Sequence, residues 1–410
     1  MALSSGWQPW VDAVGGAFIP TDIAQDVAAA RLFNQRVDPY GPVIREMHGT
    51  VVSLPANETF PYFPHPPFSL IVSWGLAFGS YQTAALIWFS ASVALLLVLS
   101  GLVVELWLPP AGSSVPLSSV LLVFGILLCW PPVLYNLEKG QWSILLAVLV
   151  ALGGRALVQR QDSAGAVWLA AAASVKVFPV VLGGYLLLRS RRALAWFIAS
   201  GLALTALPLL RIGFDAFPAF VRQSQMNMPF WETFPSVTFS LHGALARLLI
   251  GGPWAHPLVS APIISKFIEL IVVVPLLALA TQATLRSTAN GDTLLPFAAW
   301  VTMLPVLNPQ SLGHNGVLLV LPIVIALRAL QADRRTWLRA LWALSVVLVS
   351  IPRQTTWRLA PPPIDPLEGL LVVALPMWGA LMLFGVTIAL ARSASLSARS
   401  VEVKVARILD

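Results

Sequence analysis

Long apolar runs separated by short polar segments dominate this chain. Several runs reach the roughly 20 residues that a helix needs to cross a bilayer. They predict an all-α polytopic membrane protein with about 9–11 membrane helices. The predicted spans cover about 82–107, 117–136, 141–158, 193–211, 262–284, 293–308, 313–329, 337–351 and 368–391, with two further apolar stretches at 67–81 and 164–188.

The composition agrees with this class. Of 410 residues, 57% are hydrophobic and 10% are charged, whereas about 25% of the residues in soluble domains are charged. The net charge of +7 does not indicate a nucleic-acid partner, because the basic residues lie mostly in short loops between the predicted spans. The single cysteine, Cys129, cannot form an internal disulfide, and we expect it to be a small buried hydrophobic residue.

Arginine-rich loops set the expected orientation, because short cytoplasmic loops carry an excess of Lys and Arg. Counting from these loops places the segments 136–141, 212–256, 308–314 and 352–367 on the outer face. The chain then divides into an outer-face loop with interfacial helices over 1–66, a first transmembrane bundle over 67–211, an aromatic- and proline-rich outer loop over 212–256, a second transmembrane bundle over 257–391 and a cytoplasmic tail over 392–410.

The stretch 164–188 breaks the alternation, because basic residues flank a single apolar run on both sides. A hairpin of two short helices that meet near Lys176 and Pro179 would resolve this, since proline disfavours a continuous helix. Broken elements in a membrane are tolerated only where protein buries them or where they line a cavity. Lys176 is therefore expected to point into a polar space. A lysine on one continuous span, with its charge at the interface, is the alternative.

The N-terminal 40 residues contain no predicted span, since the apolar stretch at 14–20 is too short. No basic residue precedes Arg31, so no signal peptide is predicted. The segment with Asp22 has to lie outside for the polar motifs to meet. We therefore expect that an upstream helix is missing from this chain, rather than that the N-terminus crosses unaided.

Polar motifs lie between the apolar runs, all on the predicted outer face. Ionisable and amide groups are costly near hydrocarbon, so such a cluster indicates a functional site. The motifs are Asp22 with Asp38-Pro39-Tyr40, Phe63-Pro64-His65-Pro66-Pro67, Gly140-Gln141, Lys176-Val177-Phe178-Pro179, and Asn308-Pro309-Gln310-Ser311 running into His314-Asn315.

A carboxylate with several cations suits the displacement of a phosphate from a sugar. The acceptor hydroxyl needs a base, as in inverting glycoside chemistry, and the leaving phosphate needs fixed positive charge but no acid. Asp22 is the candidate base, and it could equally be a helix cap. Asp26, one turn later, is its rival. Asp38 before Pro39 is expected to start a turn.

The candidate cations each have a structural alternative. Arg353 and Arg358 lie on the predicted outer side, where arginine can bind phosphate bidentately, although anchoring beside Trp357 is equally consistent. Lys176 and His314 are further candidates for the donor phosphate. The candidates for the acceptor or sugar are His65, Gln141 and Asn315; a glutamine capping a helix is the alternative for Gln141. No metal motif and no nucleotide-binding loop are present in the sequence, so no cofactor is predicted.

Five motifs together resemble the membrane mannosyltransferases of glycosyltransferase family 87, which belong to the GT-C superfamily. They are, in order, Asp22 to Tyr40, Tyr62-Phe63-Pro64-His65-Pro66-Pro67-Phe68, Gly140-Gln141, the segment from Ala164-Gly165 through Lys176 to Pro179 with Arg189, and the region ending near His314.

This resemblance implies a GT-C-type helical bundle in the plasma membrane, with its active site on the outer face. It implies an inverting transfer of a hexose, mannose above all, from a polyprenyl-phosphate carrier to a glycolipid or polysaccharide acceptor. It also implies an aspartate base in the first outer loop, and Asp22 matches by its distance from the Asp-Pro-Tyr turn. Arabinose and glucose stay open as the sugar.

Two other classes of protein remain as alternatives. A transporter or flippase of lipid-linked sugars would show inverted repeats and a polar site near the midplane, whereas the polar motifs here gather at one face. A structural subunit of a cell-wall assembly complex would need no carboxylate and lysine at one site.

Overall fold

The computed structural model describes residues 22–52, 62–107, 115–233, 238, 240–252, 254–288 and 293–409. Within these ranges every regular element is a helix, and β-structure is limited to two isolated bridges. The prediction of an all-α membrane protein is therefore confirmed. The expectations for residues 1–21, including the apolar stretch at 14–20, lie outside the described residues.

In the part of the chain that the structure describes, five helices are long and apolar enough to cross a membrane. They are α5 (Tyr81–Trp107), α11 (Arg191–Ile212), α14 (Pro262–Thr288), η5 with α16 (Gly313–Leu319 and Val320–Ala332) and the first part of α20 (Leu375–Leu409). A bent pair, α6 (Leu117–Leu128) and α7 (Pro131–Lys139), makes a sixth candidate. The described ranges also contain five shorter apolar segments, of 10–17 residues, which account for the larger number of spans that the sequence predicts.

The prediction of one straight span at 117–136 is wrong, because this segment forms two helices with a bend between them. Helix α6 ends at Leu128, and α7 starts at Pro131 with the two axes at 71°. Consecutive prolines at 131 and 132 offer no backbone N–H to α6, whereas proline suits the first turn of a new helix. Cys129, at this bend, is exposed rather than buried.

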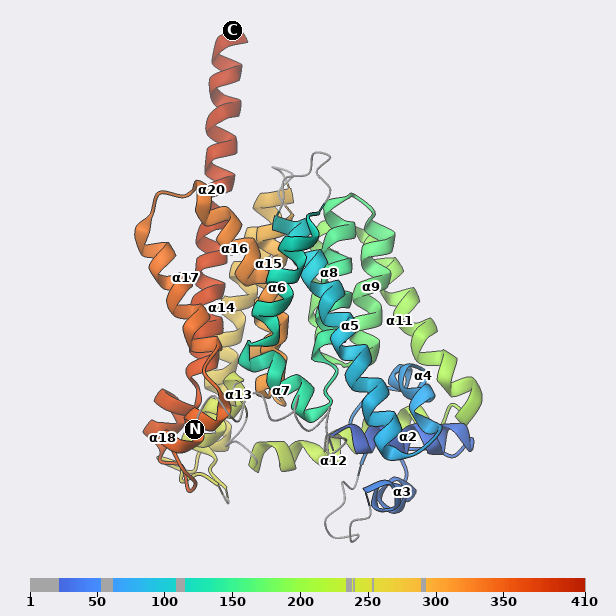
Figure 1. The fold of residues 1–410 in the computed structure, drawn as a ribbon. Helices are drawn as coiled ribbons and strands as arrows, with labels where there is room; N and C mark the ends of the chain where they lie inside the picture. Colours follow the sequence, from blue (N-terminus) through green and yellow to red (C-terminus); the bar gives the residue numbers. More distant parts are fainter. Residues whose placement is uncertain are drawn as a thin grey trace.

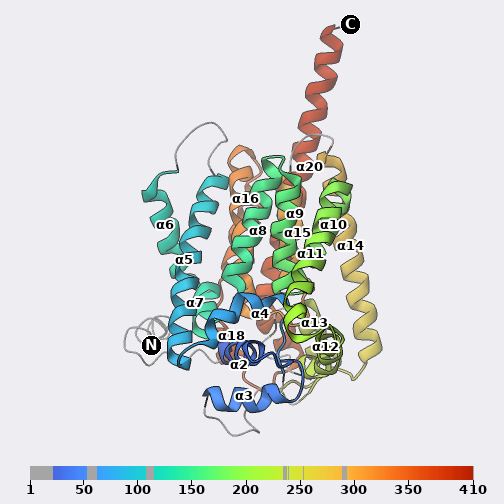
Figure 2. The same ribbon diagram turned by 90° about the vertical axis from the view of Figure 1, so that its right-hand side faces the viewer.

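The long helices run side by side, and a group of shorter helices lies across one end of the bundle (Figures 1 and 2). The crossing helices are α2 (Ile23–Asn34), α3 (Val43–Val52) and α12 (Ala216–Thr233). We call this end of the bundle the α2 end. The C-terminal part of α20 projects from the opposite end (Figure 1).

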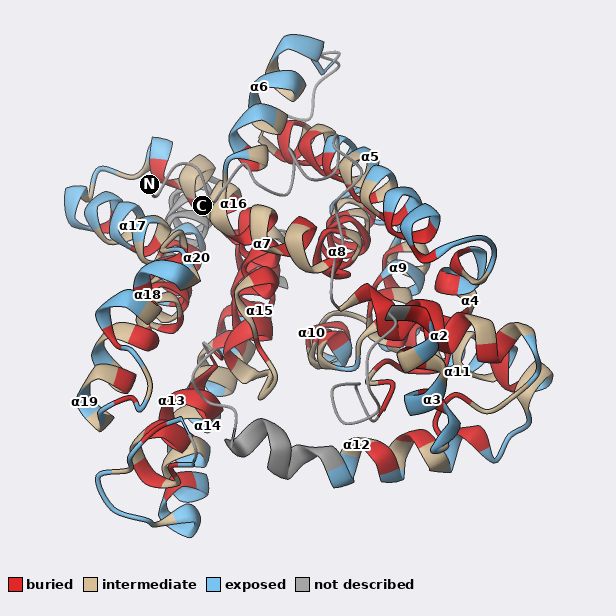
Figure 3. Cartoon of the chain, turned by 60° about the horizontal axis from the view of Figure 1, so that its bottom comes forward, coloured by how far each residue is buried: buried red, intermediate tan, exposed pale blue. Residues whose placement is uncertain are grey.

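Burial follows this layout (Figure 3). Helices α2 and α15 (Leu294–Leu307) are buried almost throughout, whereas α6 and α14 expose large apolar side chains such as Leu122 and Ile263. Lipid tails are as apolar as leucine, so these outward faces suit a membrane.

The chain reverses direction between α9 (Asp162–Val175) and α10 (Leu182–Arg189). Helix α9 ends where Lys176 adopts an extended backbone, and Pro179 lies in the short helix η3 (Phe178–Val181) that follows. At the open end of this hairpin, Arg189 Nη2 donates to Leu157 O at 2.8 Å and Arg189 Nε contacts Asp162 Oδ1 at 3.3 Å. Two short helices thus replace the alternative of one continuous span.

Glycines allow the hairpin to pack closely on α8 (Ser143–Val158). A Cβ added to Gly165 would lie 2.7 Å from Leu157 Cγ, and one added to Gly153 would lie 2.6 Å from Leu169 Cδ2. Small residues at such positions let membrane helices approach each other. This contact fixes α9, and with it the position of Lys176 at its end.

Helix α2 is held at its C-terminus by Arg211 of α11. Arg211 Nε donates to Phe33 O at 3.0 Å and Arg211 Nη2 donates to Asn34 O at 2.8 Å. The guanidinium also lies over the rings of Phe33 and Trp74, 5.4 and 5.0 Å from the centroids. A cation there satisfies the last carbonyls and complements the helix dipole.

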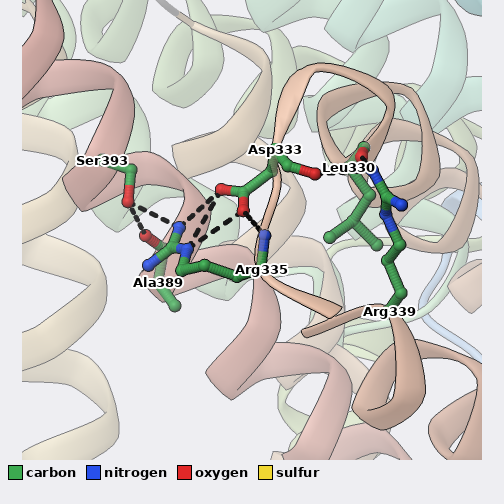
Figure 4. Close-up of polar contacts among 6 residues, drawn as sticks. All are labelled: Leu330, Asp333, Arg335, Arg339, Ala389 and Ser393. Atoms are coloured by element: carbon green, nitrogen blue, oxygen red, sulfur yellow. Dashed lines mark hydrogen bonds and ion pairs between the residues drawn. The ribbon is translucent and has the colours of Figure 1, made fainter. Parts of the chain in front are cut away.

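At the opposite end, a polar cluster ties the turn between α16 and α17 (Thr336–Val349) to α20 (Figure 4). Arg335 Nη2 donates to Asp333 Oδ2 and to Ser393 Oγ, both at 2.6 Å. Arg339 Nη2 donates to Asp333 O at 2.6 Å. These bonds fix the ends of three helices far from the polar motifs.

Candidate active site

Three predicted site residues form one hydrogen-bonded chain at the α2 end. Gln141 Nε2 donates to Asp22 Oδ2 at 2.8 Å, and Lys176 Nζ donates to Gln141 Oε1 at 3.0 Å. The three lie at the start of α2, in the turn between α7 and α8, and at the end of α9. Asp22 precedes α2 but makes no capping hydrogen bond with its side chain, so the capping alternative does not describe it.

The turn that presents Gln141 is built by its neighbours. Helix α7 ends at Lys139, and Gly140 follows as its C-cap with a φ of 67°, in the left-handed region that favours glycine; the Gln141 N–H then donates to Asn136 O at 2.9 Å. Asn136 Oδ1 in turn accepts from the Ser143 N–H at 2.9 Å. Gln141 therefore lies in a fixed turn between two helices; its backbone N–H caps α7, whereas its side chain caps neither helix and bonds to Asp22 and Lys176 instead.

Asp26 lies deeper than Asp22. Its side chain is buried, Trp142 Nε1 donates to Oδ2 at 3.1 Å, and His65 Nε2 lies 3.5 Å from Oδ1. Burial raises the pKa of Asp26 to about 8, although the Trp142 hydrogen bond and the nearby Lys176 charge both favour the ionised form. Asp26 therefore carries a proton for much of the time at neutral pH.

His65 is also buried, and it packs against Trp142 with ring centroids 5.5 Å apart. Burial, reinforced by the Lys176 charge, holds the pKa of His65 well below its usual range. The 3.5 Å contact with Asp26 is thus a contact between largely neutral groups. The Tyr40 hydroxyl donates to His65 O at 2.9 Å, and Asp38 Oδ1 accepts from the Tyr40 N–H at 2.9 Å, as expected for a turn at Asp38.

A second group gathers around Tyr135 of α7. Arg353, at the start of α18 (Arg353–Leu359), donates from Nη1 to the Tyr135 hydroxyl at 2.8 Å. The rings of His314 and Tyr135 have centroids 5.8 Å apart. Asn315 is buried beside them, and its Oδ1 accepts from Ser143 Oγ at 3.0 Å. Through Ser143 and Asn136, this group is connected to the turn that carries Gln141.

Arg358 does not join either group. Its side chain is exposed, and it makes no hydrogen bond or ion pair with any residue in the part of the chain that the structure describes. It lies one turn beyond Arg353, whose guanidinium stacks 4.5 Å over Trp357. The structure thus brings Arg353 to the site and leaves Arg358 outside it.

Sequence reasoning missed Trp142 and Tyr135. Trp142 directly follows Gln141, so its place in the motif was a usable signal. Nothing in the sequence distinguishes Tyr135 from an ordinary interfacial tyrosine, because its role depends on Arg353, 218 positions away. Among the described residues, no group of three or more His, Cys, Asp or Glu side chains could hold a metal ion.

Comparison with known proteins places this chain in a family. A family model described as Glycosyltransferase family 87 matches residues 63–288, more than half of the chain and the part that contains His65, Gln141 and Lys176. No curated protein matches the chain. With a polytopic helical fold and this match, the chain belongs to glycosyltransferase family 87.

Proposed function

We propose that the protein is an inverting membrane glycosyltransferase that moves a hexose, with mannose as the leading candidate, from a polyprenyl-phosphate carrier to a glycolipid or polysaccharide acceptor. The observation that carries this proposal is the pair of hydrogen bonds that connects Asp22 to Gln141 and Gln141 to Lys176. It places a carboxylate and a cation at one site, which is what this reaction requires. Membership of a glycosyltransferase family favours it over a transporter.

In the proposed step, Asp22 acts as the base. The acceptor hydroxyl oxygen attacks the anomeric carbon, and its proton passes to the Asp22 carboxylate. The bond between the anomeric carbon and the phosphate oxygen breaks, and the electron pair leaves with the phosphate. The hydrogen bond from Gln141 orients the carboxylate without protonating it.

Lys176 and Arg353 supply the positive charge. Lys176 reaches the site from the tip of the hairpin, and Arg353 reaches it from α18. Preorganised cations stabilise the charge that develops on the leaving phosphate. His314, buried beside Tyr135, is proposed to contact the donor phosphate as well, and His65, Gln141 and Asn315 are proposed to contact the sugar or the acceptor.

Asp22 is the better base of the two aspartates because it is only partly buried. Asp26 is enclosed by Trp142 and His65, and its raised pKa leaves it protonated for part of the time at neutral pH. Asp26 is proposed to position Trp142 and the start of α2. Its carboxyl remains the alternative base.

We propose that the site faces outward from the plasma membrane, and the arginine distribution supports its outward orientation. The turns opposite the α2 end join α8 to α9, α10 to α11 and α16 to α17 (Figure 1). Arginines gather in these turns, at 155, 160, 189, 191, 192, 334, 335 and 339. By the positive-inside bias this end faces the cytoplasm, so the α2 end faces outward.

Purified protein in liposomes tests the donor class, because such liposomes contain no enzyme that converts one donor into another. With a lipid and glycan extract as acceptor, radiolabelled mannose is expected to transfer from polyprenyl-phosphate mannose and not from a nucleotide-activated mannose. The product should have the anomeric configuration opposite to that of the donor. Transfer from the nucleotide donor alone would overturn the proposal.

A further inference from the structure

The hydroxyl hydrogen of Tyr135 has no hydrogen-bond acceptor among the described residues. Arg353 can only donate hydrogen bonds, so the Tyr135 oxygen is the acceptor in their 2.8 Å contact. The phenol hydrogen therefore needs another acceptor. No residue in the described part of the chain accepts it. Tyr135 is half-buried, and it lies on α7 just before the turn that carries Gln141.

Arg353 is held next to this hydroxyl by a hydrogen bond and by two aromatic rings. Its guanidinium stacks 4.5 Å over the Trp357 ring and 5.7 Å from the centroid of the Tyr135 ring. One nitrogen, Nη1, donates to the Tyr135 oxygen, and a guanidinium has five N–H donors in all. The pair thus combines a positive charge with donors that have no acceptor within the described ranges.

The pair also lies close to the proposed base. Tyr135 lies on α7, which ends just before Gln141, and Gln141 Nε2 donates to Asp22 Oδ2 at 2.8 Å. The buried His314 ring lies 5.8 Å from the Tyr135 ring, and its Nδ1 atom has no partner among the described residues. Buried polar atoms are normally paired, so an unpaired one indicates a missing ligand or water.

We propose that Tyr135 is a substrate-binding residue that donates its hydroxyl hydrogen to an oxygen of the lipid phosphate, next to Arg353. A sugar hydroxyl both donates and accepts, whereas a phosphate oxygen only accepts. A site that offers a cation and free donors therefore matches the phosphate. The contact transfers no proton; it holds the negatively charged phosphate of the bound donor, so its loss weakens donor binding. This inference rests on the proposed function.

The variant Tyr135→Phe removes the hydroxyl and keeps the ring against Arg353 and His314. The KM for polyprenyl-phosphate mannose is expected to rise about tenfold, the scale of one hydrogen bond to a charged group, while the KM for the acceptor stays unchanged. Tyr185→Phe is the matched control, because its hydroxyl donates to Thr293 O away from the site. An unchanged donor KM in a Tyr135→Phe protein with normal thermal stability would overturn the inference.

A second measurement separates direct binding from the positioning of Arg353. If Tyr135 only positions Arg353, Tyr135→Phe should have no effect in an Arg353→Met background. The inference predicts that most of the loss persists there. Arg353→Met itself lacks a charge and raises the donor KM. The effect of Tyr135→Phe is therefore measured as the donor KM of the double variant divided by the donor KM of Arg353→Met alone.

Binding of farnesyl phosphate and of farnesol to the purified protein distinguishes the two proposals. The phosphate should bind more tightly than the alcohol to the wild type, and Tyr135→Phe should reduce that preference. If this preference depends on Tyr135 but the wild type transfers no sugar, the anion site stands and the transferase proposal fails. If the wild type transfers sugar and the preference is unchanged in Tyr135→Phe, the inference fails alone. Inorganic phosphate as a competitor shows whether the lipid chain is required.

Discussion

At the scale of residues, two aspartates four positions apart receive different environments. Asp22 and Asp26 fall on the same side of α2 by helical spacing, so the sequence alone could not distinguish them. The difference arises from residues far away in the chain. Trp142 and His65 enclose Asp26, whereas Gln141 bonds to the less buried Asp22.

The raised pKa of Asp26 predicts a pH-dependent stability. Burial raises the pKa from 3.8 to about 8, so between these values the folded protein binds a proton that the unfolded chain has released. The contribution of Asp26 to stability therefore falls as pH rises through this window and becomes constant above about pH 8. Asp26→Asn removes this dependence. The melting temperature of Asp26→Asn minus that of the wild type should therefore increase as pH rises from 6.5 to 8.

Asp333→Asn is the control for this comparison. Hydrogen bonds from Arg335 lower the pKa of Asp333 to about 2, so that carboxyl is ionised in both the folded and the unfolded states above pH 6.5. The difference between this variant and the wild type should stay constant across the same window. Parallel melting curves for Asp26→Asn and the wild type would show that Asp26 is not a titrating buried carboxyl.

At the scale of elements, hydropathy gave the positions of the helices but not always their paths. The predicted spans at 82–107, 193–211 and 262–284 correspond to α5, α11 and α14. An apolar run does not show whether it crosses the membrane straight, bends or turns back, because all three bury the same side chains. Proline and charge were the useful signals, as at Lys176 and Pro179. The prolines at 131 and 132 carried the same signal for the bend between α6 and α7.

At the scale of the whole molecule, the site is assembled from segments that the chain order separates. The sequence could predict that Asp22, Gln141, Lys176 and Arg353 share one face, because that follows from alternation and loop charge. It could not predict that Gln141 joins Asp22 to Lys176, or that Arg358 stays outside, because side-chain contacts depend on the packing of helices distant in sequence.

The same layout predicts which end of the bundle faces outward. In a Cys129→Ala background, single cysteines at two exposed positions report the two ends: Gln354→Cys at the α2 end and Ala332→Cys at the opposite end. A membrane-impermeant maleimide should label Gln354→Cys in intact cells. It should label Ala332→Cys only after the membrane is opened. The reverse pattern would place the site on the cytoplasmic face.

The most direct test of the account is sugar transfer by Asp22→Asn and Asp26→Asn beside the wild type. Membranes carrying each protein receive radiolabelled polyprenyl-phosphate mannose. Asparagine keeps the size of aspartate but cannot act as a base, so Asp22→Asn should lose about a hundredfold in rate, the typical scale for a general base. Asp26→Asn still accepts the Trp142 hydrogen bond and should keep most of its activity. Full activity in Asp22→Asn, or a hundredfold loss in Asp26→Asn alone, would contradict the assignment of Asp22 as the base.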